Sequence, residues 1–212
     1  MLLAPGGLRV VVVSVISITL SFIAIILRIW ARRLMKRSLA LNDYMVITAM
    51  VFATGLISLA LASCFAGGIG YQVTYLAPET TTLFWKMDIA GQMHWAAANT
   101  CVKLSILSLY TVLFPIKKLA YICYVIMALS MAYLISVTLL AVLLCKPMSY
   151  NWDKTIPGGR CEGVGNAFLA AGIANLVLDA FIVVLPMPLL FRLRMSMPKR
   201  LMVVSMFSLG GM

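Results

Sequence analysis

The sequence carries little charge, very little of it acidic, and a single histidine. Only 11% of the 212 residues are charged, against about 25% in an ordinary soluble domain. Asp and Glu together number 6, whereas 63% of the residues are hydrophobic. A water-soluble chain of this length cannot hide so much apolar surface in its interior. The composition therefore excludes a soluble globular fold.

Motifs that carry catalytic chemistry are also missing. The sequence contains no Gly-rich phosphate loop after a strand, no G-x-S-x-G or H-E-x-x-H motif, and no paired catalytic carboxylates. One histidine, His94, and no close pair of cysteines leave too few ligands for a zinc site. We therefore expect no enzymatic activity and no metal site.

Long apolar stretches predict an all-α fold, a polytopic transmembrane helix bundle. A helix needs about 20 apolar residues to cross the hydrocarbon core of a bilayer. The first uncharged stretch, 10–27, is too long for the apolar part of a signal peptide, and five basic residues follow it at 28–37, which favours a true span over that alternative. We expect a single membrane domain over 1–212, with spans at 8–30, 44–65, 89–116, 119–145, 164–191 and an incomplete 201–212.

The sixth stretch is too short to cross a bilayer. At 1.5 Å per residue, 201–212 covers roughly 18 Å of a ~30 Å core. We expect the sequence to be a fragment or to end early, and a re-entrant final helix is the alternative.

Basic residues gather on one side of the predicted spans. Of the 17 Lys and Arg residues, 11 fall within 28–37, 117–118 and 192–200, which the alternation of spans places on one face. Cytoplasmic loops carry such an excess, so we expect an integral membrane protein, in the plasma membrane, with its amino terminus outside. These loops should attract anionic lipid, at about 1 kcal/mol per close charge. Short basic runs between apolar spans do not indicate nucleic acid.

Three of the five cysteines lie near the predicted outer face, where oxidation is allowed. A bond between Cys145 and Cys161 would close a loop of about 15 residues and stabilise the fold by roughly 3 kcal/mol in the chain-entropy model. We expect this pair to form a disulfide. Cys64 is a competing partner, and three free thiols are the alternative.

Two charges lie inside the predicted spans, where each costs about 2.5–3.5 kcal/mol on insertion scales. Lys103 is 14 positions after Ile89, and Asp179 is 14 positions after Gly165. Both spans run inward from the outer face, so the two charges should lie at similar depth. We expect them to pair, provided that their helices are neighbours.

A polar stripe descends the third span to Lys103. At about 100° per residue its members fall within a sector of roughly 80°; they are Asp88, Gln92, Trp95, Asn99 and Lys103. Polar groups on such a face point into the bundle, because lipid cannot satisfy them. We interpret three residues of this stripe, together with two residues of the fifth span, as the wall of a ligand pocket that opens outward. The alternative is that these residues only hydrogen-bond the helices to one another. The candidate residues are Gln92, Asn99, Lys103, Asn175 and Asp179.

Six short motifs, in order along nearly the whole chain, resemble a known family. They are Arg28 with L-A-L-N-D-Y at 39–44; G-I-G-Y-Q at 68–72; K-L-S-I-L at 103–107 with Tyr110 and Phe114; Cys145, Pro147, Trp152, Gly159 and Cys161; Asn175 and Asp179 with L-P-M-P at 185–188; and Lys199 with F-S-L-G at 207–210. The chain resembles the fungal rhodopsin domain family of seven-helix membrane proteins, which includes receptors of the Pth-eleven type and the SAT-four group. Asn42, Gln72 and Val112 stand where the family usually has an acid, a histidine and an arginine.

The resemblance implies seven helices, of which the sixth would be cut and the seventh missing. It also implies a receptor-like function: sensing of an unknown extracellular ligand, coupled to a G protein or another cytosolic partner. Retinal is not expected, because its Schiff-base lysine would lie on helix seven and Lys103 on helix three is a poor substitute. We therefore expect no cofactor. A transporter or ion carrier that uses Lys103 and Asp179 is the rival function, and a non-functional fragment is the third reading.

Overall fold

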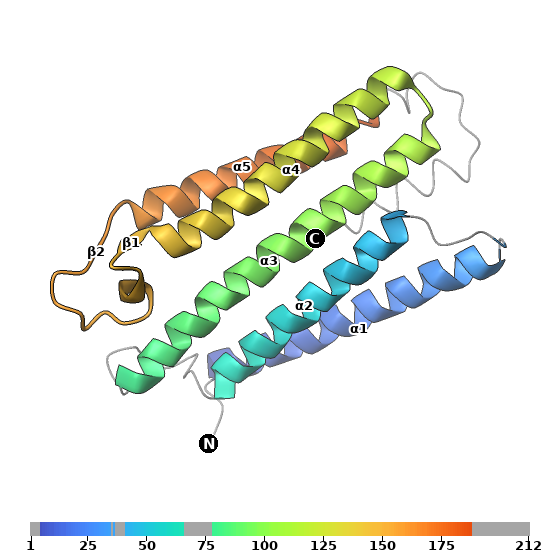
Figure 1. The fold of residues 1–212 in the computed structure, drawn as a ribbon. Coiled ribbons are helices and arrows are strands. Elements are labelled where there is room, and N and C mark those ends of the chain that lie inside the picture. Colours follow the sequence, from blue (N-terminus) through green and yellow to red (C-terminus); the bar gives the residue numbers. More distant parts are fainter. Residues whose placement is uncertain (1–4, 35, 37–40, 66–77, 188–212) are drawn as a thin grey trace.

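The computed structural model describes residues 5–34, 36, 41–65 and 78–187, which form five long helices and one structured loop (Figure 1). The helices are α1 (Pro5–Leu34), α2 (Leu41–Phe65), α3 (Pro78–Leu113), α4 (Lys117–Leu143) and α5 (Val164–Val184). Between α4 and α5 lie β1 (Cys145–Lys146), the short 3-10 helix η2 (Met148–Asn151) and β2 (Arg160–Cys161). All five long helices are long and apolar enough to cross a membrane. The predicted all-α transmembrane bundle is confirmed.

The third helix begins well before the predicted span at 89. It starts at Pro78 and has 36 residues, which makes it about 54 Å long at ~1.5 Å per residue. Proline is favoured at the first position of a helix, and an acidic residue such as Glu79 is favoured in its first turn. A search for uncharged stretches stops at the charges on Lys86 and Asp88, whereas helical hydrogen bonding continues through them. Residues 78–88 are therefore helix, where the sequence suggested a loop.

The other helices differ from the predicted spans by a few residues. α1 and α2 begin earlier than 8 and 44, because polar and turn residues next to a span still join its helix. α4 ends before Cys145, which enters β1 instead. α5 ends at Val184, two residues before Pro186, whose backbone nitrogen cannot donate a hydrogen bond. The end of the predicted fifth span, 188–191, and the whole sixth span, 201–212, lie outside the described residues.

α3 runs through the middle of the bundle, with α1 and α2 on one side and α4 and α5 on the other (Figure 1). A buried apolar cluster joins α3, α4 and α5; its members are Leu107, Tyr110, Phe114, Leu119, Cys123, Ile126, Leu178 and Ile182. On the opposite side, α2 approaches α3 closely at Gly55, where an added Cβ would lie 2.6 Å from His94 Cδ2. The central helix is thus packed against α2 on one side and against α4 and α5 on the other.

Candidate functional site

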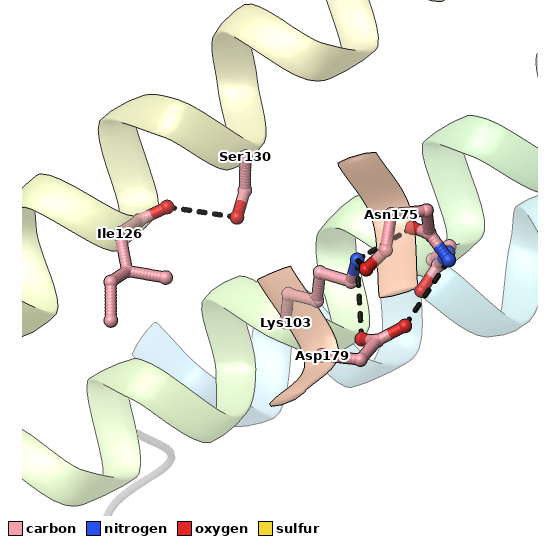
Figure 2. Close-up of polar contacts among 6 residues, drawn as sticks. Lys103, Ile126, Ser130, Asn175 and Asp179 are labelled. Atoms are coloured by element: carbon pink, nitrogen blue, oxygen red, sulfur yellow. Dashed lines mark hydrogen bonds and ion pairs between the residues drawn. The ribbon is translucent and has the colours of Figure 1, made fainter. Parts of the chain in front are cut away.

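Four of the five predicted pocket residues form one polar network between α3 and α5 (Figure 2). Lys103 Nζ lies 3.2 Å from Asp179 Oδ1 and donates to Asn175 Oδ1 at 2.6 Å. Asn99 Nδ2 donates to the same Asn175 oxygen at 2.8 Å, and Asn175 Nδ2 donates to Asp179 Oδ2 at 3.1 Å. The pairing of Lys103 with Asp179, predicted from their equal depth, is present in the structure.

The two charged side chains of the network differ in solvent exposure: the cation is buried and the anion is accessible. The Lys103 side chain is 4% exposed, whereas that of Asp179 is 45% exposed. Besides the carboxylate and the Asn175 amide, the Lys103 ammonium reaches the Asn175 backbone oxygen at 3.4 Å, and it lies 5.7 Å from the centre of the Tyr133 ring on α4. Its three hydrogens thus meet three oxygens. Such a satisfied network holds three helices together and favours the interhelical reading for these four residues.

The fifth predicted residue, Gln92, is not part of this network. It lies seven residues before Asn99, about two helical turns further toward the Pro78 end of α3. There its Nε2 donates to Asp88 Oδ2 at 2.7 Å. The structure therefore divides the predicted pocket in two, because a stripe shared along one helix face says nothing about which neighbouring helix each member meets.

Gln92 and Asp88 line a cavity of about 290 Å³ between α2 and α3. We call it the outer cavity, after the orientation predicted from the sequence; it is lined by Leu56, Leu59, Ala60 and Ser63 of α2 and by Phe84, Met87, Asp88, Gly91, Gln92 and Trp95 of α3. Sequence reasoning found three of these positions through the polar stripe. It missed the contribution of α2, whose lining residues are mostly apolar and carry no pattern that separates them from lipid-facing positions.

The loop between α4 and α5 is closed by the predicted disulfide. Cys145 and Cys161 are bonded and lie opposite each other in the antiparallel pair β1–β2, and Cys64, the predicted competitor, is a free thiol. Inside the loop, the hydroxyl and the backbone N–H of Thr155 both donate to Asp153 and hold the pKa of that carboxyl below its usual range. The loop therefore has a defined shape of its own.

Two reciprocal cation–π contacts fix this loop to the first turns of α3. Lys86 Nζ lies 5.9 Å from the centre of the Trp152 ring, and Lys154 Nζ lies 5.7 Å from the centre of the Trp85 ring. Each segment thus supplies one cation and one aromatic ring; contacts of this kind contribute about 0.5–1 kcal/mol at exposed sites. We call these four residues the outer clasp.

A buried ion-pair cluster at the opposite end joins α1, α2 and α3, and sequence reasoning missed it. Asp43 Oδ1 accepts from Arg28 Nε at 3.0 Å, and Asp43 Oδ2 lies 2.6 Å from Arg32 Nε. Arg32 also donates to the Asn42 side chain at 3.1 Å, and the Ser105 hydroxyl donates to the Asn42 backbone oxygen at 2.8 Å. The signal was present, since Arg28 and Arg32 are four residues apart on one helix face. Arg28 and Asp43 belong to one of the six family motifs, but that motif predicted no contact between them, and Arg32 entered only as a basic residue beside the first span.

Comparison with known proteins identifies the family. Residues 27–212 match the family described as the Fungal rhodopsin domain. This chain belongs to that family. The resemblance inferred from the six motifs is therefore confirmed, and the fungal rhodopsin domain described here is an integral membrane protein with a helical bundle fold.

The relatives of this fungal rhodopsin domain protein come from several fungi. Polyenoic acids biosynthesis gene cluster protein Ba17b of Metarhizium anisopliae is 28% identical over 97% of this chain and 57% of its own length. Wortmanamides biosynthesis cluster protein C of Talaromyces wortmannii is 28% identical over 90% of this chain and 53% of its own length. A SAT4 family membrane protein of Emericella nidulans is 25% identical over 68% of this chain and 38% of its own length.

The chain spans about half the length of the first two of these relatives. No solved structure matches this fungal rhodopsin domain.

Proposed function

We propose that this protein is a receptor-like sensor that binds an extracellular ligand in the outer cavity. One observation carries the proposal: the outer cavity and the polar network share one polar stripe of α3, on which Gln92 of the cavity lies two turns from Asn99 of the network. A ligand that binds one arrangement of α2 and α3 better than another shifts the balance between them. Because α3 also bonds to α2 through Ser105, such a shift reaches the opposite end of the bundle.

Two independent features support an orientation with the amino terminus outside and the Asp43 end in the cytosol. The excess of basic residues favours it through the positive-inside rule. The disulfide of the α4–α5 loop favours it too, because disulfides persist on the oxidising side of a membrane. In this orientation, at the plasma membrane, the outer cavity faces the exterior. The basic loops face anionic lipid and a cytosolic partner such as a G protein.

The disulfide offers a direct test of this orientation. In intact cells, an impermeant reductant followed by an impermeant maleimide should label the protein, because the Cys145–Cys161 bond would be accessible from outside. A Cys145→Ser, Cys161→Ser double variant should lose that reductant-dependent signal, while Cys64 keeps any background. Labelling that requires permeabilised cells would contradict the orientation.

Coupling to a G protein is testable without knowing the ligand. In lipid nanodiscs, the protein should raise the rate at which a purified fungal Gα subunit binds GTPγS several-fold above empty nanodiscs. Asp179→Asn should change this basal rate, since it alters the charge balance of the network that links α3 and α5. A rate equal to that of empty nanodiscs with each Gα subunit tested would contradict G-protein coupling.

A transporter is the second candidate, and the half-exposed Asp179 carboxylate beside Lys103 favours it. Charged groups at membrane depth mark ion and substrate pathways in pumps and transporters. In that case proteoliposomes should show proton or cation flux that Lys103→Met abolishes, with no effect on Gα. Flux and nucleotide exchange are separate readouts, so the two candidates give opposite results.

A further inference from the structure

We propose that the outer cavity binds a compact organic cation, an ammonium group carried on an aromatic or other apolar body. This inference names the ligand class of the proposed function and rests on the outer cavity being the ligand site. It depends on three properties of the cavity: its charge, its aromatic walls and its size.

The charge of the cavity is negative. Asp88 is the only charged side chain among the described residues that line it. Its Oδ2 accepts from Gln92, a neutral amide, and within the described part of the chain it has no ion-pair partner. Lys86, the cation closest in sequence, lies over the Trp152 ring in the outer clasp. Asp88 is exposed, so a ligand can reach its carboxylate, and an ammonium group in the cavity would donate a charge-assisted hydrogen bond to it.

The aromatic walls of the cavity suit the apolar body of such a ligand. Phe84 and Trp95 lie on the same side of α3 as Asp88, one turn before it and two turns after it, and Trp95 is 44% exposed. Aromatic faces attract cations and stack on apolar rings. Met87 adds a polarizable thioether, which tolerates ligands of different shape. An anion would meet the Asp88 carboxylate with no lining cation to compensate.

The size of the cavity selects a compact molecule. Its volume of about 290 Å³ is at the small end of the ~300–1,000 Å³ that small-molecule pockets occupy. The larger hollow of about 630 Å³ between α4 and α5 has no charged residue among its described lining and offers nothing to orient an ionic ligand. The outer cavity alone of these two combines a charge with aromatic walls.

The test uses phenethylammonium as the probe, with the full chain in nanodiscs and binding measured at equilibrium with the radiolabelled amine. We expect saturable binding that unlabelled phenethylammonium displaces. The neutral analogue 2-phenylethanol, and sorbate as a small polyenoic acid, should compete at least tenfold more weakly. Asp88→Asn should weaken binding of the amine at least tenfold, because it removes the charge and keeps an oxygen that accepts from Gln92.

Two further variants separate the cavity from general effects. Glu79→Gln removes one acidic charge from the same helix at an exposed position outside the cavity, and it should change the affinity less than twofold. Gly91→Leu should abolish binding by filling the cavity; its Cβ would lie an acceptable 3.6 Å from Leu56 Cδ1. The unfolding temperature of each variant without ligand shows whether it is folded.

Each outcome decides the proposal. Absence of saturable amine binding, stronger competition by sorbate, or an equal loss in Glu79→Gln and Asp88→Asn would overturn it. Amine binding that depends on Asp88 but has no effect on Gα would support the ligand class and contradict the signalling function. Gα activation without amine binding would support the signalling function and contradict the ligand class.

Discussion

Asp43→Ala is expected to lower the free energy of unfolding by about 3–5 kcal/mol, the largest loss that we predict for one substitution. The Asp43 side chain is 2% exposed and contacts two arginines, whose side chains are 30% and 19% exposed. Removing one member of a buried ion pair leaves charge without compensation, which typically costs this much. The change would also loosen the contact of α1 with α2, since Arg28 and Arg32 are the α1 residues in this cluster.

The measurement is thermal or denaturant unfolding of the purified protein in nanodiscs. Asp153→Ala is the matched control, because it removes an aspartate of the α4–α5 loop whose carboxylate, within the described residues, hydrogen-bonds to Thr155 alone and contacts no arginine. It should leave the unfolding temperature nearly unchanged. Similar shifts in the two variants would show that the Asp43 cluster is not a stabilising element.

Asp179→Leu is expected to cost about 3 kcal/mol, because it leaves the buried Lys103 ammonium with amide oxygens only. We take the low end of the usual range since Asp179 is half exposed. Replacing both partners by apolar residues of similar volume is often nearly neutral. The double variant Lys103→Met, Asp179→Leu should therefore recover most of the lost stability.

Unfolding measured for the four members of this double-mutant cycle gives the coupling between the two charges. A coupling energy near zero would contradict a stabilising ion pair between Lys103 and Asp179. The cycle also separates the two readings of the network. If Asp179→Leu altered nucleotide exchange by Gα or ion flux and left the free energy of unfolding unchanged, the network would not serve to hold the helices together.

The sequence predicts the network but not the cavity above it, and the reason is physical. Lys103 and Asp179 are charges in apolar surroundings, where an unpaired charge is costly, so their equal depth predicts the pair on the condition that α3 and α5 are neighbours, which the structure supplies. The outer cavity depends on how Leu56 and Leu59 of α2 face α3, which is decided by packing. Apolar residues on a membrane helix give the same pattern whether they meet lipid or another helix.

The ion-pair cluster at Asp43 and the start of α3 at Pro78 show two other limits. The positive-inside rule accounts for Arg28 and Arg32 without any partner, whereas the structure pairs both with Asp43 at the same end of the bundle. The start of α3 was missed because a membrane span is defined by hydrophobicity and a helix by backbone hydrogen bonds. A helix that continues beyond the bilayer, as α3 does, is therefore longer than the span that hydrophobicity predicts.

The length of α3 restricts how the molecule can move. This one rigid rod is held at three levels by three different neighbours: the loop at the outer clasp, α5 at the polar network, and α2 at the bond from Ser105. A piston-like slide along its axis would strain all three attachments together, whereas a small rotation about that axis would change them unequally. Rotation of α3 about its own axis is thus the motion that these three attachments oppose least.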